Sequence, residues 1–153
     1  MQSPSSTTSK QSWQTSTWNR AEIAALTEKA VKKYVEWLRS LKTIDLKLII
    51  LFGSYADGTF GPPSDVDILI VADKLPEDAL DRYVLLTSVP SDHEPLDIEP
   101  HTYSPDDFIA SANANNQRPT DALIEGQVLY INDEYRRKLI SALSDAHGDA
   151  NLH

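Results

Sequence analysis

The chain has 153 residues, of which 41% are hydrophobic and 24% charged, and these values are typical of one globular domain with its own core. It contains no cysteine, which excludes disulfides and thiolate metal sites. The formal net charge of -9 argues against nonspecific binding to a nucleic-acid backbone, which requires clustered lysine and arginine. No apolar run is long enough to cross a bilayer, and the N-terminus lacks the apolar core of a signal peptide, so we expect a cytoplasmic protein.

The first 16 residues are rich in Ser, Thr and Gln and show no apolar periodicity, which predicts a disordered tail over residues 1–16. A helix follows over residues 18–41, because apolar residues recur there at three- and four-residue steps and so share one face. We expect one globular domain over residues 17–146 and a short C-terminal tail over residues 147–153.

The remainder of that domain alternates strands and helices. The predicted strands cover residues 46–52, 66–71, 95–103 and 127–131. The predicted helices cover residues 76–86, 104–112, 120–125 and 134–143, with Ser104 and Thr120 as the caps of two of them. Pro100 in the third strand suits a strand end or an edge of the sheet. These elements predict an α/β (α+β) domain with a small sheet flanked by helices.

Two acids, Asp65 and Asp67, stand one residue apart at the beginning of the second strand. Alternate residues of a strand point to the same face, so the two carboxylates are expected to be neighbours, with their Cα atoms about 7 Å apart. Unpaired, they would repel each other, and a divalent cation removes that repulsion. Mg²⁺ commonly binds one or two carboxylates together with substrate phosphates. One or two Mg²⁺ ions are therefore the expected cofactor.

The first strand ends in Gly53-Ser54, and glycine there lets the backbone approach a phosphate closely. The following N–H groups and the serine hydroxyl can then face the anion. Taken alone, Gly53-Ser54 is more simply interpreted as an ordinary turn, and Asp65 as an N-cap residue. The combination favours a phosphate site, because both halves lie at the ends of buried strands joined by one loop.

A third carboxylate would complete such a site, and the third strand offers Asp97 and Glu99, which share one face. Asp97 is flanked by Leu96 and Ile98, and an acid in apolar surroundings is costly unless a cation meets it. We favour Asp97 and keep Glu99 as the alternative. The third acid could bind metal or act as a general base toward an attacking hydroxyl.

Gly53-Ser54, ten residues and then Asp65-Val66-Asp67 match the Gly-Ser-x10-Asp-x-Asp pattern. With the strand 48–52 and the third-acid strand, the chain resembles the nucleotidyltransferase fold of the DNA polymerase β superfamily, and within it the minimal nucleotidyltransferase (MNT) branch. The resemblance extends over about residues 20–143. It implies that Asp65, Asp67 and Asp97 are catalytic metal ligands and that Gly53 and Ser54 bind the triphosphate of ATP or another nucleotide.

The implied reaction moves a nucleoside monophosphate to a hydroxyl and releases pyrophosphate. In HEPN–MNT toxin–antitoxin systems, similar proteins are antitoxins that bind a HEPN ribonuclease toxin, and some transfer AMP to its tyrosine. Three hypotheses follow: an adenylylating antitoxin, a binding module that neutralises a partner by docking, and a small-molecule nucleotidyltransferase such as those that modify antibiotics. A homo-oligomer is compatible with each of them, whereas a membrane or direct nucleic-acid partner is not expected.

One position departs from the family pattern, because Asp57 stands where many relatives carry an arginine. Substitutes for that base would be Lys47, Lys74 or Arg82. The four histidines show no metal-ligand spacing, and we interpret His101, like His93, as a surface or strand-end residue.

Overall fold

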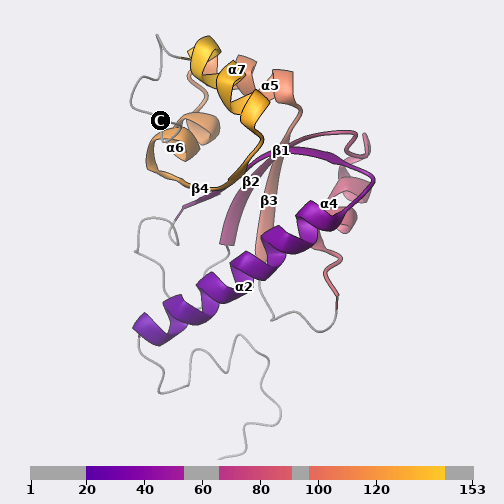
Figure 1. Cartoon of the computed structure of the whole chain (residues 1–153), viewed down its shortest axis with the longest axis vertical. Helices are drawn as coiled ribbons and strands as arrows, with labels where there is room; N and C mark the ends of the chain where they lie inside the picture. Colours follow the sequence, from indigo (N-terminus) through magenta and orange to yellow (C-terminus); the bar gives the residue numbers. More distant parts are fainter. Residues whose placement is uncertain (1–19, 54–65, 91–96, 144–153) are drawn as a thin grey trace, which may run out of the picture.

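The computed structural model of the protein describes residues 20–53, 66–90 and 97–143 (Figure 1). The strands are β1 (Asp45–Phe52), β2 (Val66–Asp73), β3 (Ile98–Tyr103) and β4 (Gln127–Ile131). The helices are α2 (Arg20–Ser40), α4 (Ala79–Thr87), α5 (Pro105–Asn113), α6 (Gln117–Glu125) and α7 (Asp133–Leu143). Among these residues, no helix is long and apolar enough to span a membrane.

The four strands form one mixed sheet in the order β3-β2-β1-β4. β1 is antiparallel to both β2 and β4, whereas β2 and β3 are parallel. β3 is thus an edge strand, which explains how it accommodates Pro100, since proline cannot donate a hydrogen bond to a second neighbour. The mixed sheet flanked by helices confirms the predicted fold class.

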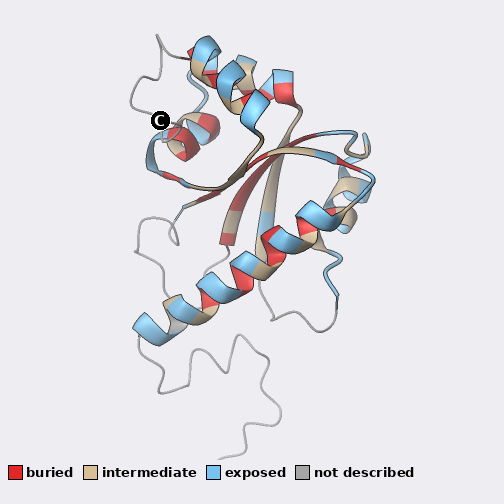
Figure 2. Ribbon diagram, viewed as in Figure 1, coloured by how far each residue is buried: buried red, intermediate tan, exposed pale blue. Residues whose placement is uncertain are grey.

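Helices cover both faces of the sheet (Figure 1). On one face, apolar residues of β1 and β2 such as Ile49 and Ile70 pack with α2 and α4. On the other face, Ile50 and Leu69 pack with α5, α6 and α7. Figure 2 shows the buried stripe of α2 facing the sheet, as the periodicity of its apolar residues predicts. Both faces of the two central strands are buried, so β2 is an almost continuous apolar run.

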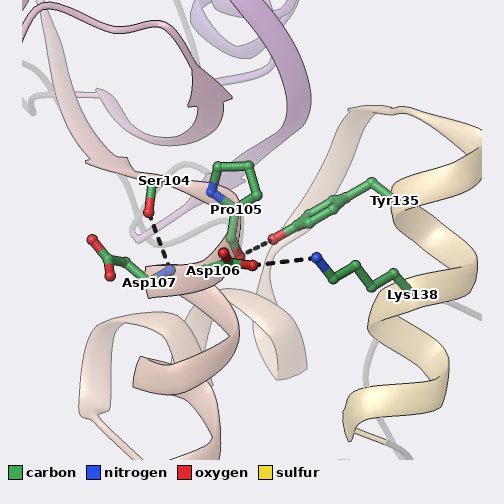
Figure 3. Close-up of polar contacts among 6 residues, drawn as sticks. All are labelled: Ser104, Pro105, Asp106, Asp107, Tyr135 and Lys138. Carbon is green, nitrogen blue, oxygen red and sulfur yellow. Dashed lines mark hydrogen bonds and ion pairs between the residues drawn. The ribbon is translucent and has the colours of Figure 1, made fainter.

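The start of α5 is joined to α7 (Figure 3). The hydroxyl of Ser104 accepts a hydrogen bond from the backbone N–H of Asp107 at 3.1 Å, which confirms Ser104 as the cap of α5. The buried phenol of Tyr135 donates to the carbonyl of Pro105 at 2.9 Å. The ion pair between Lys138 and Asp106, at 3.2 Å, is exposed and contributes little to stability.

Three predicted boundaries are wrong. α4 begins at Ala79 rather than at Pro76, because Asp78 is its cap and accepts a hydrogen bond from the backbone N–H of Asp81 at 3.0 Å. α6 begins at Gln117 rather than at Thr120, because Asn116 is the residue before the helix and the N–H of Thr120 already donates to its carbonyl at 3.2 Å. Pro119 is tolerated there because N–H groups of a first turn have no partner inside the helix. β3 begins at Ile98, so Asp97 precedes the strand, while residues 91–96 lie outside the described residues, as do both predicted tails.

Candidate metal and nucleotide site

The candidate site lies at the end of the sheet where β1 ends and β2 begins. Phe52, the last residue of β1, is paired with Asp67 of β2. Asp67 shares its face of the sheet with Leu69, which is buried under α5–α7, but Asp67 itself stands near the strand's beginning and its side chain remains 30% exposed. A carboxylate is therefore held on a rigid strand at a partly open edge of the core.

Gly53 follows Phe52 and closes the site from the β1 side. Its φ angle is +79°, a left-handed conformation that glycine adopts without steric cost. A Cβ atom at this position would lie 2.6 Å from Oδ2 of Asp67. Both the conformation and the close approach thus require glycine, because the carboxylate of Asp67 occupies the space that a side chain at this position would need.

β3 contributes the other two polar side chains of the group. Glu99 is the register partner of Asp67, and His101 lies two residues further along the same face. Nε2 of His101 lies 3.0 Å from Oδ1 of Asp67 and 4.0 Å from Oε2 of Glu99. One ligand atom from each of the three residues lies within 4.8 Å of the others. Two carboxylates and an imidazole so close together are a donor set that fits a divalent cation.

The imidazole of His101 is held firmly, because only 10% of the side chain is exposed and its ring packs edge-on against Phe52 with centroids 5.3 Å apart. The interpretation of His101 as a surface or strand-end residue is therefore wrong. Its signal in the sequence was its spacing, since it continues the alternation of Asp97 and Glu99 on one strand face.

Only some of the predicted site residues lie together in the described part of the structure. Gly53 and Asp67 are brought together, whereas Ser54, Asp65 and Asp57 lie outside the described residues. The side chain of Asp97 is exposed, and its backbone carbonyl accepts a hydrogen bond from the N–H of Val66 at 2.7 Å, which aligns the beginnings of β2 and β3. The acid opposite Asp67 is Glu99, and the role of Asp97 as third acid stays a prediction.

A cavity of about 470 Å³ is lined by Phe52 and Tyr103 from the sheet and by residues from the end of α5 to the first half of α6. Phe52 links it to the group, because its ring also packs against His101. Its volume is in the range of small-molecule sites. The aromatic side chains could contact a base, and Arg118 on the opposite wall could meet a phosphate. Arg118 was not among the bases considered from the sequence, because its proximity depends on how α6 packs on the sheet.

The three bases that were considered lie at the opposite end of the sheet. Lys47 is near the beginning of β1, where its ammonium is 3.2 Å from the carboxylate of Asp45. Lys74 follows the end of β2, and Arg82 of α4 donates to the carbonyls of Pro76 and Glu77 at 2.9 and 3.1 Å. None of the three is placed to replace an arginine beside Gly53.

The sequence of this chain was compared with those of known protein families. Residues 28–129 match the family described as the nucleotidyltransferase domain. The chain belongs to this family. The matched segment contains β1, β2, β3 and β4 up to Leu129, and with them every residue of the group around Asp67.

Relatives of this nucleotidyltransferase domain include two curated proteins of Methanocaldococcus jannaschii, each named "Putative protein adenylyltransferase". One is 54% identical over 46 residues, which are 30% of this chain and 46% of that protein. The other is 51% identical over 45 residues, which are 29% of this chain and 31% of that protein. The chain thus matches less than half the length of either protein.

Among solved structures, a nucleotidyltransferase-type protein from Sulfolobus solfataricus superposes with a TM-score of 0.50 and 17% identity, over 78% of this chain and 94% of that one. This likeness shows the nucleotidyltransferase fold. A toxin–antitoxin structure with AMP-PNP superposes with a TM-score of 0.46 and 22% identity, over 80% and 90% of the two chains.

Proposed function

We propose that this domain is a metal-dependent nucleotidyltransferase that transfers AMP from ATP to a hydroxyl of a partner protein. The observation that carries the proposal is the close approach of the Asp67 carboxylate to Gly53, which leaves no room for a Cβ atom there. It supports the proposal because the glycine proposed to bind phosphate and an acid proposed to bind metal lie side by side where β1 ends and β2 begins. Phe52, which is paired with Asp67, lines the cavity of about 470 Å³.

The residues divide the work of the reaction. Asp65, Asp67 and Asp97 are the proposed catalytic acids and metal ligands, and Glu99 is a further candidate by its position opposite Asp67. Bound Mg²⁺ would neutralise charge on the phosphates and orient them. The backbone at Gly53 leaves room for the triphosphate, and Ser54 is the proposed hydroxyl donor to it.

The transfer forms a bond between the acceptor oxygen and the α-phosphorus and breaks the bond from that phosphorus to the oxygen bridging to the β-phosphate. Pyrophosphate leaves with the electron pair of the broken bond. The proton of the acceptor hydroxyl passes to a carboxylate that acts as general base, for which Asp97 is the proposed residue. The acids thus serve both to hold the cation and to accept the proton.

The proposed acceptor is a tyrosine on a HEPN-type toxin, so that the domain acts as an antitoxin. The resemblance to the MNT branch supports this, and both curated relatives carry the name of protein adenylyltransferases. The proposed partners are therefore ATP and a protein rather than a small acceptor.

Incubation of the protein with α-labelled ATP, Mg²⁺ and a HEPN protein tests the proposal, with label on the HEPN protein as the expected result. Asp67→Asn should abolish labelling. Asp106→Asn is the matched control, because Asp106 is exposed, lies on α5 away from the group and forms only a surface ion pair. Labelling by Asp67→Asn at the wild-type rate, or none by the wild type, would contradict the proposal.

A second candidate function is neutralisation by docking, and the surface of α4 favours it. Leu80, Tyr83 and Val84 recur at three- and four-residue spacing and are 68%, 53% and 51% exposed. Figure 2 colours most of α4 as exposed or intermediate. The acids Asp78 and Asp81 flank the apolar stripe, so its expected occupant is an amphipathic segment of the partner with basic residues at its edges.

The two functions separate experimentally, because α4 packs on the face of the sheet opposite to Asp67. If docking suffices, Asp67→Asn will still protect cells from the toxin, while Leu80→Ser with Val84→Ser will not. If transfer is required, Asp67→Asn will fold and bind the partner but will no longer protect.

A further inference from the structure

His101 belongs to the group around Asp67 but not to the family motif. Its ring is nine-tenths buried, and Nε2 points at Oδ1 of Asp67 from 3.0 Å. The β2–β3 pairing fixes the backbone on both sides of this contact, and Phe52 packs against the ring. The fold therefore holds Nε2 of His101 beside the carboxylate of Asp67.

The spacing of the two atoms is the spacing of two metal ligands. Ligand atoms about 2.1 Å from one cation and at right angles to each other are separated by about 3.0 Å. Nε2 of His101 and Oδ1 of Asp67 have this separation. Oε2 of Glu99, at 4.0 Å from Nε2, belongs to a side chain that is 56% exposed and can rotate inward.

We propose that His101 is a nitrogen ligand which, with Asp67 and Glu99, gives the site a preference for a first-row transition ion such as Mn²⁺ or Co²⁺ over Mg²⁺. Mg²⁺ favours oxygen ligands throughout, whereas imidazole binds the transition ions of the series more strongly. The inference rests on the proposed function only in that Asp67 holds a cation. It adds the identity of that cation and a ligand that the sequence motif omits.

A purely orienting role is the competing account, in which His101 donates a hydrogen bond to Asp67 and never touches metal. His101→Gln separates the two, because the glutamine amide can donate to Asp67 from nearly the same place, while its nitrogen does not bind metal. An orienting role is rescued by glutamine and a ligand role is not.

The direct test is pulsed EPR of Mn²⁺ bound to protein labelled with ¹⁵N at histidine only, which excludes signals from nucleotide nitrogens. The wild type should show ¹⁵N coupling to Mn²⁺, and His101→Gln should show none. Titration calorimetry should show that His101→Gln weakens Mn²⁺ binding by ~10-fold or more, the usual scale for losing a group that supports a metal. Mg²⁺ binding should change far less.

The outcomes distinguish the two proposals. Binding of Mn²⁺ without ¹⁵N coupling, or an unchanged Mn²⁺-to-Mg²⁺ preference in His101→Gln, would overturn the role of His101 and leave the proposed function intact. Failure of the wild type to bind any divalent cation, with or without ATP, would overturn both. Asp67→Asn is the reference for a site that has lost its central ligand, and it should bind neither ion.

Discussion

Replacing Gly53 by alanine tests whether the candidate site depends on the close approach of Asp67 to this position. Left-handed backbone costs alanine about 1–2 kcal/mol. The new methyl would also lie 2.6 Å from Oδ2 of Asp67, so the carboxylate must turn away and loses its contact with His101. Hydrogen bonds to charged groups contribute about 1.5–3 kcal/mol, and less for a carboxylate that is partly exposed. We therefore expect Gly53→Ala to lower the free energy of unfolding by about 2–3 kcal/mol.

Urea unfolding measures this loss, and a double-mutant cycle assigns it. Asp67→Ala removes the carboxylate, so in that background Gly53→Ala should cost only the conformational part, about 1–2 kcal/mol. Gly53→Asn should be less destabilised than Gly53→Ala, because asparagine tolerates positive φ. It should still fail to bind metal, because its Cβ would displace the carboxylate of Asp67. An equal cost of Gly53→Ala with and without the Asp67 carboxylate would refute the reasoning.

Gly126→Ala is the matched control for loss of stability as such. A Cβ at Gly126 would lie 2.5 Å from Cγ2 of Ile50 and 3.1 Å from the carbonyl oxygen of Leu51, and no atom of Asp67 is among its nearest neighbours. This variant should be destabilised while its folded fraction still binds Mn²⁺ with wild-type affinity. Gly53→Ala should instead lose Mn²⁺ affinity even at temperatures where it is fully folded.

Three further predictions concern other parts of the molecule. Burial raises the pKa of the Tyr34 and Tyr135 phenols, with the carboxylates of Asp106 and Asp73 adding to it at Tyr135. Because the unfolded chain ionises first, stability should be complete below about pH 10 and be lost as the pH rises further, and Tyr34→Phe should flatten this loss in urea unfolding between pH 8 and 11. Arg118→Ala should raise the KM for ATP about 10-fold, the scale of one charge-assisted hydrogen bond, with little change in melting temperature. Leu80→Ser should change the free energy of unfolding by less than about 0.5 kcal/mol, because the side chain is 68% exposed, yet weaken co-purification with the partner.

The sequence predicted the strands well because both faces of β1 and β2 are buried and leave continuous apolar runs. Gly53 and Asp67 were also recognised, since each belongs to a short local pattern. The start of α6 was missed, because Thr120 is a strong capping type and Asn116 caps without a side-chain hydrogen bond.

The β3 half of the site depends on register, which local patterns do not determine. Asp97 and Glu99 share a strand face, so alternation alone could not decide which of them lies opposite Asp67. The parallel pairing of β2 with β3 makes Glu99 the register partner of Asp67 and brings His101 beside the same carboxylate, while Asp97 as the third acid stays a prediction. This pairing joins residues about thirty positions apart and is fixed by the packing of the whole sheet.

Transfer of label from α-labelled ATP to a HEPN partner, compared between the wild type, Asp67→Asn and Asp106→Asn, tests the central claim most directly. The wild type and Asp106→Asn should label the partner equally in the presence of a divalent cation, and Asp67→Asn should not label it at all. Equal labelling by all three proteins would contradict the assignment of the site. Absence of label from all three, with the partner bound and ATP present, would contradict the assignment of the reaction.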